Sequence, residues 1–320
     1  MKPLVSICIP NYNGERYIRY AIESALNQSY RNIEVVVIDN ASTDGSWNII
    51  KSYGKRVRKF RHKFNIGYNR NLNSCVEIAK GKYMKILHSD DILEKDAVEH
   101  QTKIMKNMPT AGFVYSPVRF INEEGNFIGN SAQPENDTLI PGIKKLAELL
   151  EGNHIMFPSV MIRKECFEEA GFFDGEMPYC NDWDMWMRIC MKYDAAYSSR
   201  ISALYRVHTS SGSMKYEKTH IDGFDQIKCL NKIFSMINDN SILERKKYYY
   251  KRLAMEQISR GLNLVIKGNG NHGRKYIMFS PIAYNNAAFT LFSYFIYMTT
   301  YLGKIPAKYL LALGKKITRQ

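Results

Sequence analysis

The sequence predicts an α/β protein with a mixed, mostly parallel sheet flanked by helices, followed by a helical C-terminal extension. Two patterns support this fold class. Over the first 110 residues, short β-branched runs alternate with helix-period segments, an order that predicts a parallel sheet covered on both faces. From about residue 222 onward the pattern is mostly helical.

The alternation begins with a strand at residues 4–9 and a helix from Glu15 to Leu26. The run "NIEVVVI" is continuous and β-branched, as is typical of a buried parallel strand. The other elements expected before residue 110 are a helix at 47–53, a weaker strand at 57–60, a helix at 67–81 with Gly81 at its end, a strand at 83–87 and a helix at 96–108.

Beyond residue 110 the pattern is mixed. "GFVYSPVRFI" and "FIGN" predict a strand and a hairpin, and "SVMIR" predicts a further strand. Helices are expected at residues 144–150 and over "DWDMWMRICMKY", before strands in "AAYSSRISALYRV".

Three polar loops, "PNYN", "DNASTD" and "HSDD", each follow a predicted strand. Ligands of parallel sheets bind beyond the carboxyl ends of the strands. We therefore expect these loops to gather on one edge of the sheet and to form the ligand site.

Composition excludes several classes of protein. Apolar residues make up 45% and charged residues 24% of the 320 positions, as in ordinary globular proteins. The six cysteines form no CxxC pair, which favours reduced thiols in the cytosol over a zinc site or disulfide framework. The opening "MKPLVSICIP" has too short an apolar run for a signal peptide.

The net charge of +14 is concentrated in the last quarter of the chain. Residues 241–320 contain 14 Lys and Arg against two acids, so the remainder carries only about +2. Nucleic acid and an anionic membrane surface are both candidate partners for this basic segment, whereas the core need not bind a polyanion.

Asp90 and Asp91 stand side by side where an apolar strand ends. Two carboxylates there could hold a hard cation such as Mg²⁺ or Mn²⁺. The alternative is a turn, "SDD", that caps the helix expected from residue 96. Read alone, the dipeptide favours the cap.

The loop "DNASTDGS" lacks the GxGxxG and P-loop patterns, which disfavours a dinucleotide-binding Rossmann domain and a P-loop NTPase. Asp39, Asn40 and Asp44 could pair with a pyrimidine edge or with ribose hydroxyls. Equally, the loop could be a turn whose Asp44 or Ser46 caps the next helix.

Asp182 lies at or just before the first turn of its predicted helix, where the helix dipole favours an ionised general base. Trp183 and Trp186 would share a face and either join the core or stack on a sugar. Asp184 could pair with Arg188 at i+4.

Arg206 and His208 alternate along a predicted strand and would share one face. Together they could hold a diphosphate, and His208 could also ligate a metal. A structural role at the strand end is the alternative.

Taken together, "VSICIPNYNGERYIRYAIESALNQSYRNIEVVVIDNASTDGS", "NIGYNRNLNSCVEIAKGKYMKILHSDDIL" and "NDWDMWMRI" resemble the family 2 glycosyltransferases. These have the GT-A fold and use nucleotide sugars. The resemblance runs in order over about the first 215 residues, and it is specific because all the motifs occur in that order and spacing.

The resemblance implies roles for the loops on the sheet edge. Pro10, Tyr12 and Asn13 would line the nucleotide pocket, and Asp39 and Asn40 would read the base and ribose.

Arg70 and Asn71 would lie near the diphosphate. Ser89, Asp90 and Asp91 match the family's metal motif, with Asp91 as the direct ligand of Mn²⁺ or Mg²⁺ and Asp90 nearer the ribose or sugar.

In the acceptor half of the resemblance, Asp182 matches the catalytic base. It would deprotonate an acceptor hydroxyl that attacks the anomeric carbon, in one displacement with inversion. Arg206 and His208 match a loop that often closes over the diphosphate.

Two positions depart from the family pattern. The metal motif often reads Asp-x-Asp-Asp, and its first position here is His88, which puts an extra carboxylate contact in doubt. The nucleotide loop commonly begins Asp-Asp, and here it is Asp39-Asn40. The uncharged Asn40 leaves the choice between UDP and dTDP donors open.

The segment Ala287–Leu302 is apolar and aromatic but has only 16 residues, fewer than the roughly 20 that a spanning helix needs. With the lysine-containing segment after it, it fits a pair of membrane-surface helices, and ordinary core helices are the alternative.

The resemblance and the tail together predict a transferase domain at 1–215, with a nucleotide-binding half at 1–110 and an acceptor half at 111–215. A helical extension at 216–275 and a basic amphipathic tail at 276–320 follow. The expected partners are a nucleotide-sugar donor, a glycan or lipid-linked acceptor and the inner face of the cell membrane, with no nucleic acid. The competing hypotheses are a sugar nucleotidyltransferase and a non-catalytic nucleic-acid binder.

Overall fold

A computed structural model describes residues 2–132 and 134–302, and within them the chain divides into two compact units. Residues 2–149 and 154–211 form the first, and residues 150–153 and 212–302 form the second. The predicted boundary after residue 215 falls inside α8 (Gly212–Thr219). The predicted divisions at residues 110 and 275 stay predictions.

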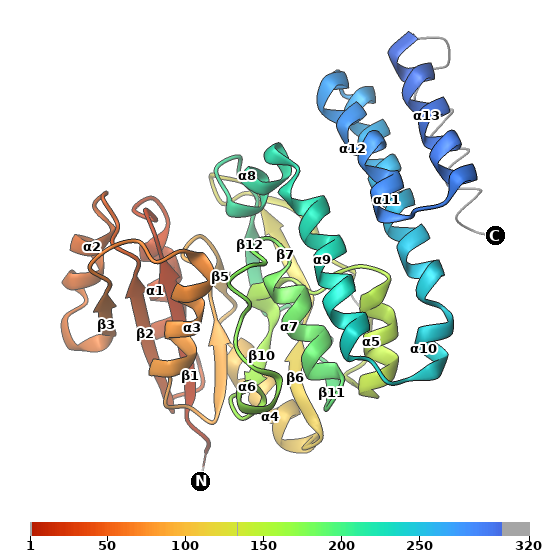
Figure 1. Cartoon of the computed structure of the whole chain (residues 1–320). Coiled ribbons are helices and arrows are strands. Elements are labelled where there is room, and N and C mark those ends of the chain that lie inside the picture. The colour runs from red at the N-terminus through yellow and green to blue at the C-terminus, as the bar shows by residue number, and fades with distance from the viewer. Residues whose placement is uncertain (1, 133, 303–320) are drawn as a thin grey trace. The chain divides into compact units, whose positions relative to one another are not determined.

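The first unit contains an eight-stranded sheet in the order β3-β2-β1-β4-β10-β6-β11-β9 (Figure 1). Strands β10 and β9 are antiparallel to their neighbours and all other pairs are parallel, so the predicted mixed, mostly parallel sheet is confirmed. The strands are β1 (Val5–Asn11), β2 (Ile33–Asp39), β3 (Arg58–Arg61), β4 (Tyr83–Ile86), β6 (Ala111–Tyr115), β9 (Thr138–Ile140), β10 (Met161–Arg163) and β11 (Asp194–Tyr197).

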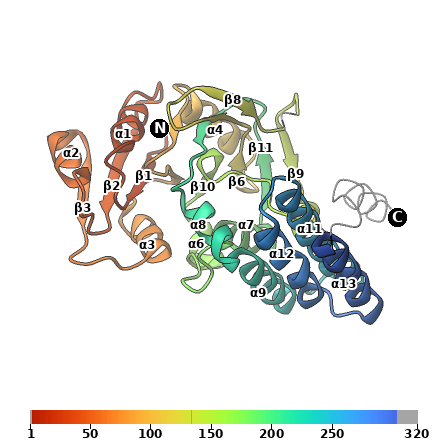
Figure 2. The same ribbon diagram turned by 90° about the horizontal axis from the view of Figure 1, so that it is seen from above.

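Helices cover both faces of this sheet, which explains why β1 is buried along its whole length. Figure 2 shows α1 and α4 on one face and α3, α6 and α7 on the other. The helices of this unit are α1 (Ile18–Leu26), α2 (Ser46–Ser52), α3 (Tyr68–Ile78), α4 (Ala97–Asn107), α5 (Gly142–Leu150), α6 (Cys166–Ala170) and α7 (Asn181–Cys190), with the short turns η1 (Gly54–Arg56) and η2 (Phe157–Ser159).

The parallel order β2-β1-β4 brings the carboxyl ends of these strands together, as predicted. In the register of the sheet Asn11 pairs with Asp39, and Cys8 pairs with Ile86. The three polar loops therefore start from one edge.

A second sheet, in the order β5-β12-β7-β8, was only partly predicted. Its strands are β5 (Ile92–Leu93), β7 (Val118–Ile121), β8 (Phe127–Asn130) and β12 (Ala203–Arg206). The hairpin β7-β8 was expected, but β5 is too short to show any periodicity. It begins directly after Asp91, so the interpretation of "SDD" as a helix cap is wrong: α4 begins after Asp96, whose side chain makes no cap hydrogen bond.

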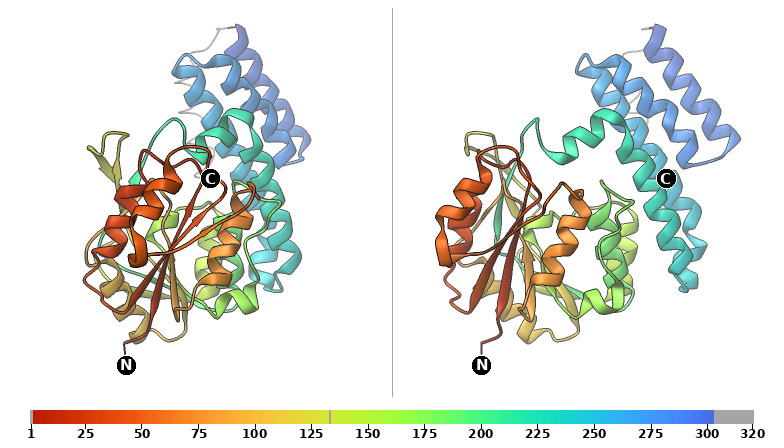
Figure 3. Two further views of the ribbon diagram at one scale, coloured as in Figure 1. Left: turned by 90° about the vertical axis from the view of Figure 1, so that its left-hand side faces the viewer. Right: turned by 60° about the vertical axis from the view of Figure 1, so that its left-hand side comes forward.

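The second unit is helical, as predicted, and Figure 3 shows its last three helices side by side in blue. Its further helices are α9 (Ile221–Met236), α10 (Asn240–Glu244), α11 (Lys246–Ile266), α12 (Gly270–Ala283) and α13 (Ala287–Leu302). Helices α11 and α12 approach closely at Gly261 and Gly273. A Cβ at either glycine would meet the carbonyl oxygen of the other, at 2.5 and 2.3 Å respectively.

Helix α13 exposes an apolar stripe. Phe289 and Ile296 are buried, and the Ser293 hydroxyl lies 2.9 Å from that of Ser280 on α12. The exposed positions recur at three- and four-residue intervals, on one face: Leu291, Tyr294, Phe295, Met298 and Tyr301. No helix within the described residues is both long and apolar enough to cross a bilayer. Residues 303–320 of the predicted tail lie outside the described residues.

Lys85 is a basic residue buried in the core of the first unit. Lys85 on β4 is completely buried and donates hydrogen bonds to Gln101 Oε1 at 2.9 Å and to the Val160 carbonyl oxygen at 3.4 Å. Burial lowers the pKa of the Lys85 ammonium from 10.5 to about 7. This lowering of the pKa corresponds to a free-energy penalty of about 5 kcal/mol on the charged ammonium in the folded protein.

We expect Lys85→Met to be more stable than the wild type by about 2–4 kcal/mol at pH 7 and below, because the loss of the charge outweighs the unpaired Gln101 oxygen. Between pH 7 and 10.5 the unfolded wild-type chain binds one proton more than the folded chain. Wild-type stability therefore rises with pH in that window, and the advantage of the variant shrinks. Urea unfolding at several pH values measures this, and a difference independent of pH would contradict it.

Candidate functional site

The first and third polar loops touch at Gly14. A Cβ there would lie 2.3 Å from Asn11 Oδ1 and 2.9 Å from Ser89 Oγ, so only glycine allows the loops to approach so closely. The structure thus brings "PNYNG" and "HSDD" together at the edge of the sheet, with Ser89 against the loop that follows β1.

Asp39 is fully buried and is held inside the second loop. Its carboxylate accepts hydrogen bonds from Asn11 Nδ2 at 2.9 Å and from the Ser42 amide at 3.1 Å, and Arg61 Nε lies 3.1 Å away. These contacts tie the loop after β2 to the end of β1.

Asn40 connects the same loop to the start of α3. Its side-chain nitrogen donates to Asn65 Oδ1 at 2.9 Å and its oxygen accepts from the Ile66 amide at 2.9 Å. In this structure both predicted base-reading side chains are engaged by the protein, and their contact with a nucleotide stays a prediction.

The other predicted nucleotide-pocket residues differ in exposure. Pro10 is buried within β1, whereas the Tyr12 side chain is 49% exposed at the edge. Asn13 has a left-handed φ of 51°, and its Oδ1 accepts from the Thr43 amide at 2.8 Å. Tyr12 therefore offers the free aromatic surface of this loop.

The two acids of the third loop have different hydrogen-bond partners. Asp90 Oδ2 lies 2.9 Å from His208 Nε2, while Asp91 Oδ1 accepts from the Arg206 amide at 2.9 Å. Asp91 is 1% exposed, and its other oxygen, Oδ2, has no hydrogen-bond partner among the described residues. An orphaned buried carboxylate oxygen calls for a ligand.

The pKa values of the two carboxyl groups are shifted in opposite directions. Burial and the neighbouring charge of Asp90 raise the pKa of Asp91 well above its usual range, and the Arg206 amide only partly opposes this. Burial also acts to raise the pKa of Asp90, but the hydrogen bond from His208 and the nearby His88 outweigh it and lower that pKa. A bound cation would favour the charged form of both groups.

His88 completes a group of possible cation ligands. Among the described residues, one ligand atom each from His88, Asp90 and Asp91 lies within 4.8 Å of the others. The sequence flagged His88 only as a departure from the family motif. His208 is outside this group: its Nδ1 lies 2.8 Å from Ser210 Oγ, and its role as a metal ligand stays a prediction.

Arg206 acts in this structure as an internal brace. It is 4% exposed, its guanidinium donates to the carbonyl oxygens of Asp90 and Asn122 at 2.9 and 3.0 Å, and it lies 4.4 Å from the centre of the Tyr17 ring. These contacts fix the acid loop to the β7-β8 hairpin. Its predicted contact with a diphosphate stays a prediction.

Asp182 lies in the first turn of α7, as predicted, and its Oδ1 accepts from the Trp183 amide at 2.6 Å. Trp183 and Trp186 are both buried, so the alternative in which one stacks on a sugar is wrong. The predicted pair of Asp184 and Arg188 is present at 2.7 Å.

On α3, Arg70 is exposed while Asn71 is buried, with its Nδ2 3.4 Å from the Ile38 carbonyl oxygen. Tyr68, two residues before Arg70, was not among the site residues predicted from the sequence. Its hydroxyl lies 2.6 Å from His88 Nε2. Tyr68 is 38% exposed, but burial of its hydroxyl and the charges of Asp182 and Asp90 raise the pKa of that hydroxyl well above its usual range.

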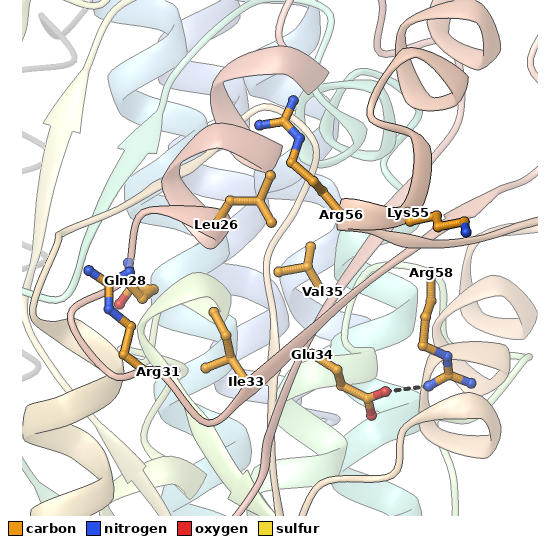
Figure 4. A pocket seen from close by; sticks show the side chains of 9 residues that line it. All are labelled: Leu26, Gln28, Arg31, Ile33, Glu34, Val35, Lys55, Arg56 and Arg58. Carbon is orange, nitrogen blue, oxygen red and sulfur yellow. Dashed lines mark hydrogen bonds and ion pairs between the residues drawn. The ribbon is translucent and has the colours of Figure 1, made fainter.

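A hollow at the other end of β2 is unrelated to this edge. Figure 4 shows it lined by Ile33, Glu34 and Val35, at the beginning of β2, together with Leu26, Gln28, Arg31, Lys55, Arg56 and Arg58. The polar loops instead follow the last residue of β2, Asp39.

Comparison with known sequences identifies the family. A family model described as "Glycosyl transferase family 2" matches residues 6–171. An uncharacterized glycosyltransferase of Rickettsia felis is 34% identical over 220 residues, which cover 67% of this chain and 36% of that protein. The chain spans about a third of the length of the first curated relatives it matches.

Solved structures share the fold. The crystal structure of S. aureus TarS 1–349 in complex with UDP-GlcNAc has a TM-score of 0.66 and 16% identity, covering 95% of this chain and 92% of that chain. The mannosyltransferase PcManGT from Pyrobaculum calidifontis, in complex with GDP-Man and Mn²⁺, has a TM-score of 0.60 and 16% identity, covering 100% and 81%. The predicted GT-A-type fold class is thus confirmed.

We expect Arg206→Gln to destabilise the protein by about 2–4 kcal/mol, because it removes a buried guanidinium that donates to the carbonyl oxygens of Asp90 and Asn122. Arg200→Gln is the matched control. Arg200 is exposed and lies 3.4 Å from Asp96, so its loss should cost less than about 1 kcal/mol. Chemical unfolding compares the two, and equal losses of stability would contradict the bracing role.

Proposed function

This chain belongs to glycosyl transferase family 2, and from that premise we propose that it moves a sugar from a nucleoside-diphosphate donor to an acceptor hydroxyl with inversion. The observation that carries the proposal is the orphaned, buried Oδ2 of Asp91 at the edge where the three loops meet. A divalent cation such as Mn²⁺ or Mg²⁺ is the ligand that this oxygen and its neighbours fit.

The residues that would hold the cation are Asp91 as direct ligand, with Asp90 and His88 beside it. When bound, a cation neutralises charge that develops on the departing nucleoside diphosphate. Support also comes from the Mn²⁺ bound to the mannosyltransferase of the same fold. Exposed Arg70 is the side chain on α3 that could pair with the diphosphate from the protein side.

The donor would be a UDP- or dTDP-sugar. Exposed Tyr12 offers a surface on which a base can stack. The Asn40 oxygen accepts one hydrogen bond in the protein, and its second lone pair could accept from a pyrimidine N–H. TarS, which binds UDP-GlcNAc on this fold, supports a uridine donor.

Asp182 would act as the general base. Its place in the first turn of α7 stabilises the carboxylate, and its charge, like that of Asp90, contributes to the raised pKa of the Tyr68 hydroxyl. The carboxylate takes the proton of the acceptor hydroxyl while that oxygen bonds to the anomeric carbon. The bond from this carbon to the diphosphate breaks, and the nucleoside diphosphate leaves with the bonding pair.

The acceptor would be a glycan or a lipid-linked sugar in the assembly of a bacterial surface polysaccharide or lipopolysaccharide. The apolar stripe on α13 supports this, because a surface of Leu291, Phe295 and Met298 suits a membrane interface. The 14 basic residues of 241–320 would add attraction to anionic lipids. We therefore propose a peripheral location at the cytoplasmic face of the membrane.

The cation-dependent donor site predicts that UDP binds the wild type in Mn²⁺ at least about 10-fold more tightly than in EDTA, and that Asp91→Asn removes this gain. Calorimetric titration of UDP and dTDP measures both, and the better ligand identifies the base. Asp96→Asn, an exposed acid beside Arg200, is the control and should keep the gain. The proposal would be contradicted if the affinities for UDP and dTDP changed neither with the cation nor with the Asp91 substitution.

The role of Asp182 predicts a separation of binding from turnover. Asp182→Asn should bind UDP like the wild type but release UDP from the active UDP-sugar about 10²–10⁴-fold more slowly. Glu168→Gln, an exposed acid on α6, serves as the control. Wild-type turnover in Asp182→Asn would exclude this residue as the base.

A further inference from the structure

His88 lies between a tyrosine and the acid pair, with one ring nitrogen toward each. Its Nε2 is 2.6 Å from the Tyr68 hydroxyl, and its Nδ1 is 3.7 Å from Asp91 Oδ2, the orphaned oxygen. The Nδ1 to Oδ2 distance is too long for a hydrogen bond. Two polar atoms of different residues therefore face each other across a gap without being bonded.

We propose that His88 Nδ1 is a ligand of the cation, that Tyr68 orients the ring for this role, and that the pair shifts the ion preference from Mg²⁺ toward Mn²⁺ and Co²⁺. The inference rests on the proposed donor site and adds to it the choice of ion. Tyr68 is a positioning residue in this scheme, since it acts through His88.

The distance suits a shared ion. Two ligand atoms that are each about 2.1 Å from one ion lie about 3 Å apart at a right angle and about 4 Å apart when opposite. The 3.7 Å between Nδ1 and Oδ2 lies between these two values, so the two atoms would move about 0.7 Å closer to occupy neighbouring positions on an octahedral ion. The Asp91 side chain is buried, and Oδ2 has no other partner in the described chain, so the ion would satisfy it.

Tyr68 can hold His88 in the tautomer that ligation needs, because its hydroxyl oxygen can accept a hydrogen bond from Nε2–H as well as donate one to Nε2. A neutral imidazole carries its proton on one nitrogen only. If Nε2–H donates to the Tyr68 oxygen, the lone pair of Nδ1 is directed at the gap beside Asp91. Such an outer hydrogen bond on the second nitrogen is the usual way in which a ligating histidine is fixed.

Aromatic packing keeps the ring in place. The His88 ring centre is 4.7 Å from that of Phe157, which in turn packs on Phe173 at 5.7 Å and on Trp186 at 5.7 Å. The imidazole is thus held against a buried aromatic wall, with the Tyr68 ring 5.9 Å away. A preorganised ligand loses little freedom when it binds.

Imidazole and carboxylate differ in the ions that they favour. Mg²⁺ prefers oxygen ligands, whereas a ring nitrogen raises affinity for transition ions in the order Mn²⁺, Fe²⁺, Co²⁺. A histidine at position 88 would therefore lower the affinity for Mg²⁺ relative to the affinities for Mn²⁺ and Co²⁺. His208 is less suited to this task, because its nitrogens already face Asp90 and Ser210.

The test measures the metal and not turnover. Mn²⁺ is titrated into the full chain with UDP present, and its binding is measured as the loss of the electron paramagnetic resonance signal of free Mn²⁺. The affinities for Co²⁺ and Mg²⁺ are measured by competition with Mn²⁺. His88→Asp should lower the ratio of the Mn²⁺ affinity to the Mg²⁺ affinity at least about 10-fold. Tyr68→Phe should lower the affinity for Mn²⁺ about 10-fold. Tyr20→Phe, on exposed α1 surface, is the control and should match the wild type.

A spectroscopic signature identifies the ligand itself. Bound Mn²⁺ should show nitrogen hyperfine coupling in the wild type and in His208→Gln but not in His88→Asp. Coupling that disappears only in His208→Gln, or an unchanged ion preference in both His88→Asp and Tyr68→Phe, would overturn the inference while leaving the donor site intact. Absence of any Mn²⁺ or UDP binding would instead overturn the proposed function. If His88→Asp does not fold, the Tyr68→Phe and His208→Gln results still decide the matter.

Discussion

The burial of Asp91 beside Asp90 is the constraint on which the site depends. Two adjacent carboxylates at the end of a buried strand repel each other, and burial adds to the cost. The chain offsets this with one partner for each acid, the Arg206 amide for Asp91 and the His208 ring for Asp90. Within the described part of the chain, one oxygen of Asp91 has no hydrogen-bond partner, and the proposed chemistry follows from that oxygen.

The same constraint explains the second sheet. The amide that meets Asp91 belongs to the last residue of β12, a strand that pairs with β5 immediately after the acids. The Arg206 side chain then returns to the Asp90 carbonyl and to the β7-β8 hairpin. Segments more than 80 residues apart in sequence thus position one carboxylate, which makes the acid loop a product of tertiary structure rather than a local turn.

The sequence predicted what local patterns encode. The β-branched runs of β1 and β2 and the loops after them predicted the parallel sheet and the gathering of the loops at one edge, but not the order of the strands. Two-residue β5 has no periodicity to detect, so the acid pair resembled a helix cap. Long-range partners were equally invisible: nothing near Tyr68 in the chain indicates His88, and nothing near Asp39 indicates the contacts with Asn11 and Arg61 that hold it inside its loop.

In the proposed donor site, Asp91, the first loop and the loop after β2 surround one cation. The most direct measurement is a crystal structure of this chain with UDP and Mn²⁺, with data that locate Mn²⁺ by its anomalous scattering. We expect a single peak bonded to Asp91 Oδ2, with the diphosphate on the same ion and the base near Tyr12. An ion peak away from Asp91, or UDP bound elsewhere, such as in the hollow between Arg31 and Arg58, would contradict it.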